Sequence, residues 1–362
     1  MNKQNAFYPG KQWLDVDGNP IHAHGGSVIY HDGKFYWYGE NKENVHNIEQ
    51  VWHYGVRMYC SDDLYNWKDL GIILDPIDDI SSPLHPSRII DRPHIIYNEK
   101  TKKYIMWIKF AGDNEHINDW SIQRMGIAVS DSLTGKYELV KEFYPNGYKS
   151  GDFDLVKDEK TGDAYIYFGR ILTHPSDTVC MKLTDDYMGV VEGEISTHFK
   201  FGSPPNAREA PCYFERHGKK YLMTSGTTGY HPNPSIFAVA ENYHGPFTVL
   251  GDATCDKDIT KSTYHSQASS IFKHPFIDDL YIMIADRWLV DLDLSKLEWI
   301  TNGYRILQAE PPVDTHGLTW EEVRQYSKRD ISKAAYVWLP IQFDGDRPYI
   351  KWYDSWKIED FK

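Results

Sequence analysis

The fold is decided by the stretch His31-Asp-Gly-Lys-Phe-Tyr-Trp-Tyr-Gly39, in which a polar turn leads into a short alternating strand rich in aromatic residues. The pattern returns four times, as Asn98-Glu-Lys-Thr-Lys-Lys-Tyr-Ile-Met-Trp107, Lys157-Asp-Glu-Lys-Thr-Gly-Asp-Ala-Tyr-Ile-Tyr167, Arg216-His-Gly-Lys-Lys-Tyr-Leu-Met223 and Phe276-Ile-Asp-Asp-Leu-Tyr-Ile-Met283. Aligned on Tyr36, Tyr104, Tyr165, Tyr221 and Tyr281, the copies lie 68, 61, 56 and 60 residues apart. Each copy predicts a β-hairpin, because an apolar strand precedes the turn and an alternating strand follows it.

A weaker second element follows several of these hairpins and supplies two further strands. It is seen at residues 58–67, 127–137 and 236–247. Four strands in about every 60 residues, without helical periodicity, are typical of propeller blades. The sequence therefore predicts an all-β fold, a five-bladed β-propeller. The alternative is a β-sandwich with chance repetition, but sandwiches do not repeat at this period.

The last part of the chain predicts one more hairpin, over residues 336–352. It could complete the fifth blade or begin a sixth, and we favour five because few residues remain after Tyr281 and they must also close the ring. One amphipathic helix is predicted near residues 319–325, where Thr319 can cap it. No linker or block of charge divides the chain, so residues 1–362 are predicted to form a single catalytic domain.

The composition limits the partners. With 39 basic and 52 acidic residues the formal net charge is −13, which argues against nucleic acid or an anionic membrane as a partner. No apolar run is long enough to span a bilayer. The first residues contain no apolar signal segment, so a cytoplasmic location is the default expectation, and secretion is expected if a signal was removed. The four cysteines lie far apart without zinc spacing. The oligomeric state is not predicted.

Polar residues recur at the same phase of all five repeats, just before the apolar strand of each hairpin. Because the innermost strand of each blade faces the central channel, these side chains are predicted to share one pocket. The stretches are Ile21-His-Ala-His-Gly-Gly-Ser-Val-Ile29, Ile89-Ile-Asp-Arg-Pro-His-Ile-Ile96, Lys149-Ser-Gly-Asp-Phe-Asp-Leu-Val156, Ala207-Arg-Glu-Ala-Pro-Cys-Tyr213 and Tyr264-His-Ser-Gln-Ala-Ser-Ser-Ile271.

The motifs within these stretches resemble glycoside hydrolase family 43, most closely its exo-β-1,3-galactanase branch. They are Asp91-Arg-Pro-His94, Gly151-Asp152, Arg208-Glu-Ala-Pro211 and Ser266-Gln267, together with Ala23-His-Gly-Gly26 and Tyr38-Gly-Glu-Asn-Lys42. The resemblance runs from about residue 17 to residue 356. It implies that Glu209 is the general acid and that Asp152 tunes and orients it, because a second carboxylate disfavours ionisation of the first. The alternatives are an ion pair of Glu209 with Arg208, and a turn cap at Asp152 with Asp154 taking its role.

The base departs from the usual pattern of the family, because residues 22–26 contain no carboxylate. The resemblance implies that Gln267 holds the attacking water, and that Asp91 binds a sugar hydroxyl or helps to move the proton. The alternative for Gln267 is an amide that only lines the channel. For an inverting displacement, we expect about 6.5–9.5 Å between Glu209 and the group that activates water.

Substrate contacts are predicted at several further positions, each with a structural alternative. Glu40 is expected to bond sugar hydroxyls unless it belongs to a surface turn, and Thr228 resembles a substrate-contacting position of the branch. Aromatic residues are candidate stacking platforms, with the propeller core as the alternative: Trp107, Trp120, Tyr230 and Trp288. His24 is expected in the channel, but without the carboxylate cluster that calcium prefers, so neither a metal nor a cofactor is predicted.

These inferences predict an exo-acting, inverting glycosidase that releases galactose from β-1,3-galactan of the arabinogalactan type. An α-L-arabinofuranosidase or β-D-galactofuranosidase is the alternative among enzymes. A catalytically silent carbohydrate-binding propeller is the alternative from another class. The predicted partner in each case is an oligosaccharide or polysaccharide.

Overall fold

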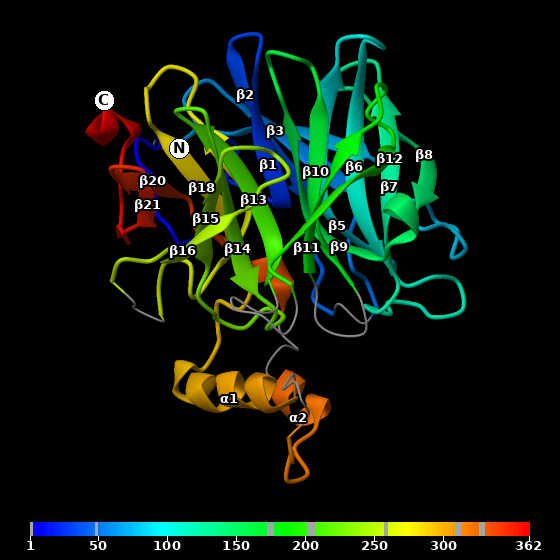
Figure 1. The fold of residues 1–362 in the computed structure, drawn as a ribbon, viewed down its shortest axis with the longest axis vertical. Coiled ribbons are helices and arrows are strands. Elements are labelled where there is room, and N and C mark those ends of the chain that lie inside the picture. Colours follow the sequence, from blue (N-terminus) through cyan, green and yellow to red (C-terminus); the bar gives the residue numbers. More distant parts are fainter. Residues whose placement is uncertain are drawn as a thin grey trace.

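The computed structural model describes residues 3–47, 50–171, 177–200, 208–256, 260–307, 313–325 and 330–362. In this described part, the strands form five antiparallel sheets arranged around a common axis, which confirms the predicted five-bladed propeller (Figure 1). In the first four sheets, the strands follow one another in chain order from one edge to the other.

The blades have the following strands. Blade 1 contains β1 (His24–His31), β2 (Lys34–Glu40), β3 (Val56–Ser61) and β4 (Lys68–Leu74). Blade 2 contains β5 (Ile89–Asn98), β6 (Lys103–Ala111), β7 (Gln123–Ser130) and β8 (Glu138–Phe143). Blade 3 contains β9 (Ser150–Lys157), β10 (Ala164–Arg170), β11 (Asp177–Leu183) and β12 (Val190–His198). Blade 4 contains β13 (Arg208–Arg216), β14 (Lys219–Gly226), β15 (Ile236–Ala240) and β16 (Thr248–Asp252).

Blade 5 is interrupted. It contains β17 (Gln267–Lys273), β18 (Tyr281–Arg287), β20 (Leu339–Asp344) and β21 (Arg347–Ile350), and the short β19 (Ala335–Tyr336) also pairs with β18. The predicted final hairpin therefore completes the fifth blade. Short 3₁₀ helices cover Pro145–Gly147, Leu294–Lys296, Ile331–Lys333 and Ile358–Phe361.

Two α-helices lie between β18 and β19, in a segment that stands to one side of the sheets (Figure 1). The predicted helix is α2 (Trp320–Arg324), and Thr319 caps it through a reciprocal pair of hydrogen bonds with Glu322. The sequence analysis missed α1 (Leu297–Leu307), whose middle holds β-branched residues, asparagine and glycine. Packing stabilises it, since Ile300 and Tyr304 lie in one buried cluster. No helix in the described residues is both long and apolar enough to cross a membrane.

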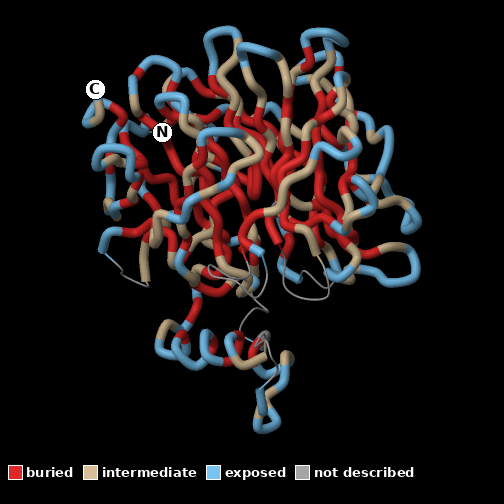
Figure 2. The backbone as a smooth tube through the Cα atoms, in the orientation of Figure 1, coloured by how far each residue is buried: buried red, intermediate tan, exposed pale blue. Residues whose placement is uncertain are grey.

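Buried residues concentrate in the middle of the sheets, while most turns between strands are exposed (Figure 2). The largest cluster joins blades 1, 4 and 5 and includes Trp37 and Trp338, whose ring centroids lie 4.7 Å apart in an edge-to-face arrangement. Much of the aromatic excess in the sequence is therefore used to pack blades against one another.

The ring closes through the two ends of the chain. Phe7 and Trp356 exchange backbone hydrogen bonds of 2.9 and 3.2 Å, and their rings stack with centroids 4.4 Å apart. Nearer the axis, the hydroxyl of Ser269 on β17 donates to the carbonyl of Gly26 on β1 over 2.7 Å. Blades 1 and 5 are thus joined at both their inner and outer parts.

Replacing Phe7 with alanine should lower the free energy of unfolding by about 3–5 kcal/mol, because the ring is 2% exposed and leaves a cavity beside Trp356. Urea denaturation measures the change. Phe276→Ala is the matched control, since this ring is 69% exposed and should cost much less. Equal losses for the two variants would show that the contact between the chain ends contributes little to closure.

Candidate active site

Backbone bulges turn the channel ends of the innermost strands toward one another. The pairing register shifts between Asp91 and His94 on β5, and between Glu209 and Cys212 on β13. Arg92 and Ala210 at these shifts have positive φ angles of 50° and 51°. A bulge re-aims the side chains around it, so both motifs direct polar groups into the channel.

Gly25 on β1 is required by the close approach of a carboxyl group. Its φ is +63°, and a Cβ atom there would collide with Oε1 of Glu40. Glu40 lies directly opposite His24 in the pairing of β2 with β1. The Ala23-His-Gly-Gly26 motif therefore makes room for a side chain from the neighbouring strand.

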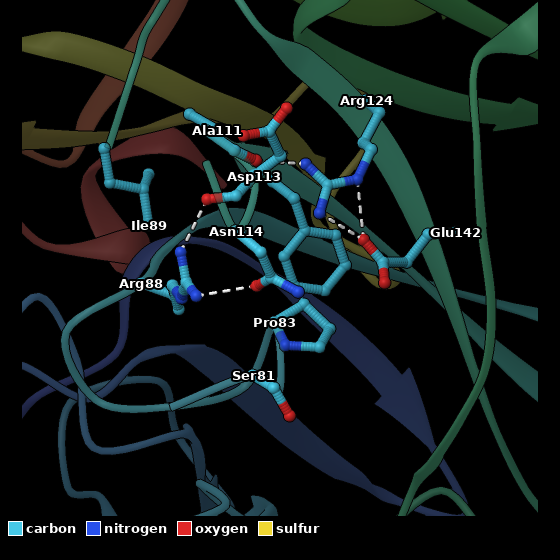
Figure 3. A pocket seen from close by; sticks show the side chains of 11 residues that line it. Ser81, Pro83, Arg88, Ile89, Ala111, Asp113, Asn114, Arg124 and Glu142 are labelled. Carbon is cyan, nitrogen blue, oxygen red and sulfur yellow. Dashed lines mark hydrogen bonds and ion pairs between the residues drawn. The ribbon is translucent and has the colours of Figure 1, made fainter. Parts of the chain in front are cut away.

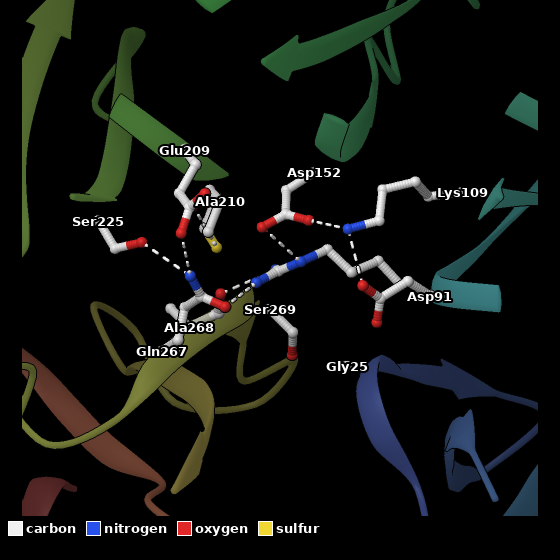
Figure 4. A network of polar contacts seen from close by, with 12 residues as sticks. Gly25, Asp91, Lys109, Asp152, Glu209, Ala210, Ser225, Gln267, Ala268 and Ser269 are labelled. Atoms are coloured by element: carbon white, nitrogen blue, oxygen red, sulfur yellow. Dashed lines mark hydrogen bonds and ion pairs between the residues drawn. The ribbon is translucent and has the colours of Figure 1, made fainter. Parts of the chain in front are cut away.

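The predicted catalytic residues belong to one polar network (Figure 4). Glu209 Oε1 accepts a hydrogen bond of 3.0 Å from Nε2 of Gln267, and Oε1 of Gln267 accepts one of 2.7 Å from Nη2 of Arg92. Nε of Arg92 lies 3.1 Å from Oδ2 of Asp152. Lys109 contacts Oδ1 of Asp152 as well, so this carboxylate touches two cations.

The network continues past Lys109 to a second pair of carboxyl groups. Nζ of Lys109 lies 2.7 Å from Oδ2 of Asp91, and Nζ of Lys42 lies 2.6 Å from Oε2 of Glu40. Burial, followed by the charge of Asp91, raises the pKa of Glu40 well above its usual range. Burial opposes ionisation of Asp91 too, but Lys109 and a hydrogen bond with Glu40 outweigh it and lower the pKa of Asp91. The two pKa values are therefore moved in opposite directions, that of Glu40 toward the protonated form and that of Asp91 toward the ionised form.

Glu209 has the properties that a general acid needs near neutral pH. Burial and then the negative charge of Asp152 raise the pKa of Glu209 to about 8, against the opposing influences of Lys109, Arg92 and the hydrogen bond from Gln267. A carboxyl group in this state holds its proton at neutral pH and can deliver it to a leaving oxygen.

The structure separates the predicted residues from their alternatives. Arg208 donates to Oγ1 of Thr224 over 3.1 Å and to the carbonyls of Thr224 and Pro234, so its hydrogen bonds go to blade 4 rather than to Glu209. Asp154 accepts the backbone N–H of Tyr213 over 2.7 Å, and burial raises its pKa to about 7. The contacts of Asp152 are cations rather than the N–H groups of a turn.

Comparison with known proteins identifies the family of the chain. The pattern of Glycosyl hydrolases family 43 matches residues 17–270. The chain belongs to this family. It is a family 43 glycoside hydrolase, and such enzymes act on carbohydrates.

Several solved structures are similar to the whole family 43 chain. A family 43 β-1,3-galactosidase is 30% identical with a TM-score of 0.77, covering 99% of this chain and 65% of its own. A second β-1,3-galactosidase, solved with galactodeoxynojirimycin, is 26% identical with a TM-score of 0.76, covering 97% of this chain and all of its own. An exo-β-1,3-galactanase from Clostridium thermocellum is 27% identical with a TM-score of 0.74, covering 98% of this chain and 67% of its own.

The match to curated sequences is more distant. A protein of Escherichia coli (strain K12), provisionally named a β-xylosidase, is 26% identical over 208 residues, which are 56% of the family 43 chain and 37% of the relative. The chain thus spans little more than a third of this relative and about two thirds of the first galactosidase.

The aromatic candidates of the family 43 chain divide into site and core. Trp120 is 42% exposed and its ring centroid lies 5.2 Å from Nζ of Lys109, so one face is available beside the network. Tyr230 and Trp288 pack together with centroids 5.4 Å apart, and Asp91, Glu40 and Asp152 all contribute to the raised pKa of Tyr230 after burial. Trp107 is 0% exposed, and its indole N–H donates to a carbonyl within the core between blades 2 and 3. The structure does not bring Trp107 to the site.

Two other predicted contacts are engaged within the protein. The hydroxyl of Thr228 donates to the carbonyl of His231 over 2.8 Å and accepts from Asn233 over 2.7 Å, so it stabilises its own loop. His24 is completely buried, with Nδ1 2.8 Å from Oδ1 of Asp286. The polar side-chain atoms of both residues are therefore engaged by neighbouring protein groups.

The loop that carries Trp120 is held by two arginines beside a cavity of about 110 Å³ (Figure 3). Arg88 donates to the carbonyl of Asp113 and to Oδ1 of Asn114, each over 2.7 Å. Arg124 donates to the carbonyl of Gly112 and pairs with Glu142. These donors bind the loop and its neighbours. The two arginines therefore hold the loop of Trp120 in place.

One geometric prediction is wrong for Gln267. The amide nitrogen lies 3.0 Å from Glu209, in direct contact rather than about 6.5–9.5 Å away. That wider spacing separates two carboxyl groups with a water between them, whereas a neutral amide can donate directly to the acid.

In the described residues, no group of three or more histidine, cysteine or acidic side chains is placed to hold a metal ion.

The sequence analysis missed the role of the two cations that contact Asp152. Lys109 is the direct pairing partner of Asp91 in the register of β5 with β6. Counting residues outward from the turn of that hairpin would have placed Phe110 there, because the bulge between Asp91 and His94 shifts the register by one residue. Arg92 lies within the Asp91-Arg-Pro-His94 motif itself. A positive φ at a non-glycine residue, which aims Arg92 into the channel, has no reliable sequence signal.

Glu209→Gln should lower turnover of a glycoside with a sugar leaving group by about 10²–10⁴, because the amide cannot donate the catalytic proton. A nitrophenyl glycoside needs less protonation and should lose less. Glu215→Gln, at the other end of β13, is the matched control and should keep normal turnover. Equal activity of Glu209→Gln and the parent enzyme on the sugar leaving group would remove Glu209 from the mechanism.

Asp152→Asn should move the basic limb of the pH profile of kcat/KM to lower pH. The reaction needs protonated Glu209, so activity falls as pH rises through its pKa, about 8 in the parent enzyme. Removing the negative charge of Asp152 lowers that pKa and brings the fall to lower pH. Asp154→Asn is the control two residues along β9, and its limb should stay in place. An unmoved limb in Asp152→Asn with a reduced Tm would make Asp152 a structural residue.

Proposed function

We propose that this family 43 enzyme is exo-acting and releases galactose from β-1,3-galactan of the arabinogalactan type. The observation that carries the proposal is the buried carboxyl group of Glu209, whose pKa is raised to about 8 and which is joined through Gln267 and Arg92 to Asp152 in one network. Similarity to two β-1,3-galactosidases and an exo-β-1,3-galactanase over almost the whole chain supports galactose as the sugar. The β-xylosidase relative is similar over a much shorter stretch.

In the proposed reaction, the bond between the anomeric carbon and the bridging oxygen breaks as Glu209 donates its proton to that oxygen. A water attacks the anomeric carbon from the opposite face, so the configuration inverts. Both N–H groups of the Gln267 amide are engaged, by Glu209 and by Oγ of Ser225 at 3.0 Å each. Its carbonyl oxygen accepts from Arg92 and keeps a second lone pair that can hold this water.

The water must also lose a proton. A neutral amide is a very weak base, so Gln267 acts by position. Asp91 is the ionised carboxylate at the other end of the network (Figure 4), and we propose it as the group that helps to move the proton. Glu40, predicted to bond sugar hydroxyls, is completely buried, and its oxygens contact Lys42 and accept the backbone N–H of Arg92, so it supports these two residues instead.

Incubation with a panel of substrates tests the sugar and the class of protein. We expect galactose from β-1,3-galactobiose and β-1,3-galactan, with much lower activity on nitrophenyl arabinofuranoside, galactofuranoside and xyloside. Glu209→Gln is the control for contaminating activity. Preferred cleavage of a furanoside or the xyloside would overturn the galactan assignment, and no cleavage of any substrate would favour a carbohydrate-binding protein.

Proton NMR of the first-formed sugar tests the stereochemistry. Inversion of a β-galactoside gives α-galactose first, followed by mutarotation to the equilibrium mixture. The β anomer appearing first would contradict single displacement and would require a covalent intermediate.

A further inference from the structure

Arg92 connects three functional groups through one guanidinium. Its Nε contacts Asp152, its Nη2 donates to the side chain of Gln267, and its Nη1 donates to the carbonyl of Ala268 over 2.9 Å. The side chain of Arg92 is only 6% exposed. These bonds tie β5 to β9 and β17 at the level of the proposed acid.

The contact with Arg92 decides which end of the Gln267 amide faces the acid. A guanidinium only donates hydrogen bonds, so the atom 2.7 Å from Nη2 must be the carbonyl oxygen. The NH₂ group then points to Glu209 and Ser225. The opposite orientation would set N–H against N–H at Arg92, so it is disfavoured.

The orientation of the amide in turn decides where the acid holds its proton. Oε1 of Glu209 accepts a hydrogen bond from Gln267. In a protonated carboxyl group the carbonyl oxygen is a much better acceptor than the hydroxyl oxygen, so the accepting Oε1 is the carbonyl oxygen. This places the proton on Oε2, for which no hydrogen-bond partner is found among the described residues.

We propose that Arg92 is a positioning residue that fixes the Gln267 amide and, through it, places the catalytic proton on Oε2 of Glu209. The inference rests on the general-acid role of Glu209 in the proposed function. It adds that Gln267 serves the acid as a hydrogen-bond donor, besides any contact of its carbonyl with water. Arg92 needs no contact with the sugar for this role.

A double-mutant cycle with Arg92→Lys and Gln267→Met tests whether Arg92 acts through the amide. Lysine keeps the positive charge but loses the fork that reaches both Asp152 and Gln267. We expect Arg92→Lys to lower kcat by about 10²-fold on β-1,3-galactobiose, because the acid is misplaced. The loss should be smaller on a nitrophenyl galactoside. In the Gln267→Met background, Arg92→Lys should lower kcat little further, because the amide that Arg92 positions is already absent.

Arg216→Lys is the matched control. Arg216 lies at the far end of β13, donates from two nitrogens to Asp279 and is equally buried, with a side-chain exposure of 9%. This variant should share any general loss of stability but keep kcat and the pH profile. Additive losses in the cycle, or equal losses on the two leaving groups, would overturn the proposal, because they place the effect of Arg92 on Asp152 or on the water.

Titration of Glu209 by carboxyl ¹³C NMR provides a readout that needs no substrate. The hydrogen bond from Gln267 favours the ionised acid, so losing it should raise the pKa of Glu209 in both Arg92→Lys and Gln267→Met. Arg216→Lys should leave the titration unchanged. If Arg92→Lys does not fold, Gln267→Met alone decides, and an unmoved titration overturns the proposal. The NMR titration does not depend on which sugar is cleaved. Failure of the galactan assignment can therefore be told apart from failure of the role proposed for Arg92.

Discussion

Carboxyl groups buried in a protein must either contact cations or keep their protons, and this constraint organises the channel of the propeller. Seven ionisable side chains meet there: Glu40, Asp91, Asp152 and Glu209 with Lys42, Arg92 and Lys109. Asp91 and Asp152 contact cations directly. Glu40 contacts Lys42, but its complete burial and the charge of Asp91 still raise its pKa. Glu209 accepts from a neutral amide, and among the described residues no cation contacts it directly. The acid is therefore the carboxyl group that the cations of the network do not touch.

The blades supply the rigidity that such a network needs. Below the acid, the channel is held by bonds between innermost strands: Asp154 on β9 accepts from β13, His94 on β5 lies 3.1 Å from the carbonyl of Ser269, and Ser269 donates to β1. Each bond joins a different pair of blades. A small displacement of one blade would therefore change several contacts, which keeps Glu209, Gln267 and Arg92 in register.

The sequence alone was sufficient to predict the features that follow from its repeating pattern. Alternating tyrosine-rich hairpins predicted five blades, and the phase of Asp91, Asp152, Glu209 and Gln267 predicted that they share a pocket. Features that depend on packing or backbone conformation were missed, such as α1 and the direction of Arg92. Trp107 shows the same limit, because no local pattern separates a tryptophan that faces the channel from one packed between blades.

The missing carboxylate of blade 1 has a structural counterpart. Residues 22–26 contain none, yet Glu40 enters the same space from β2, opposite His24 and over the bare backbone of Gly25. Burial and the nearby charge of Asp91 raise the pKa of Glu40 well above its usual range. A protonated carboxyl donates a hydrogen bond but cannot take a proton from water. The site therefore has a carboxyl group where one is expected, but burial reduces its basicity. In the proposed reaction, the carbonyl oxygen of Gln267 and the carboxylate of Asp91 accept the hydrogens of the water instead.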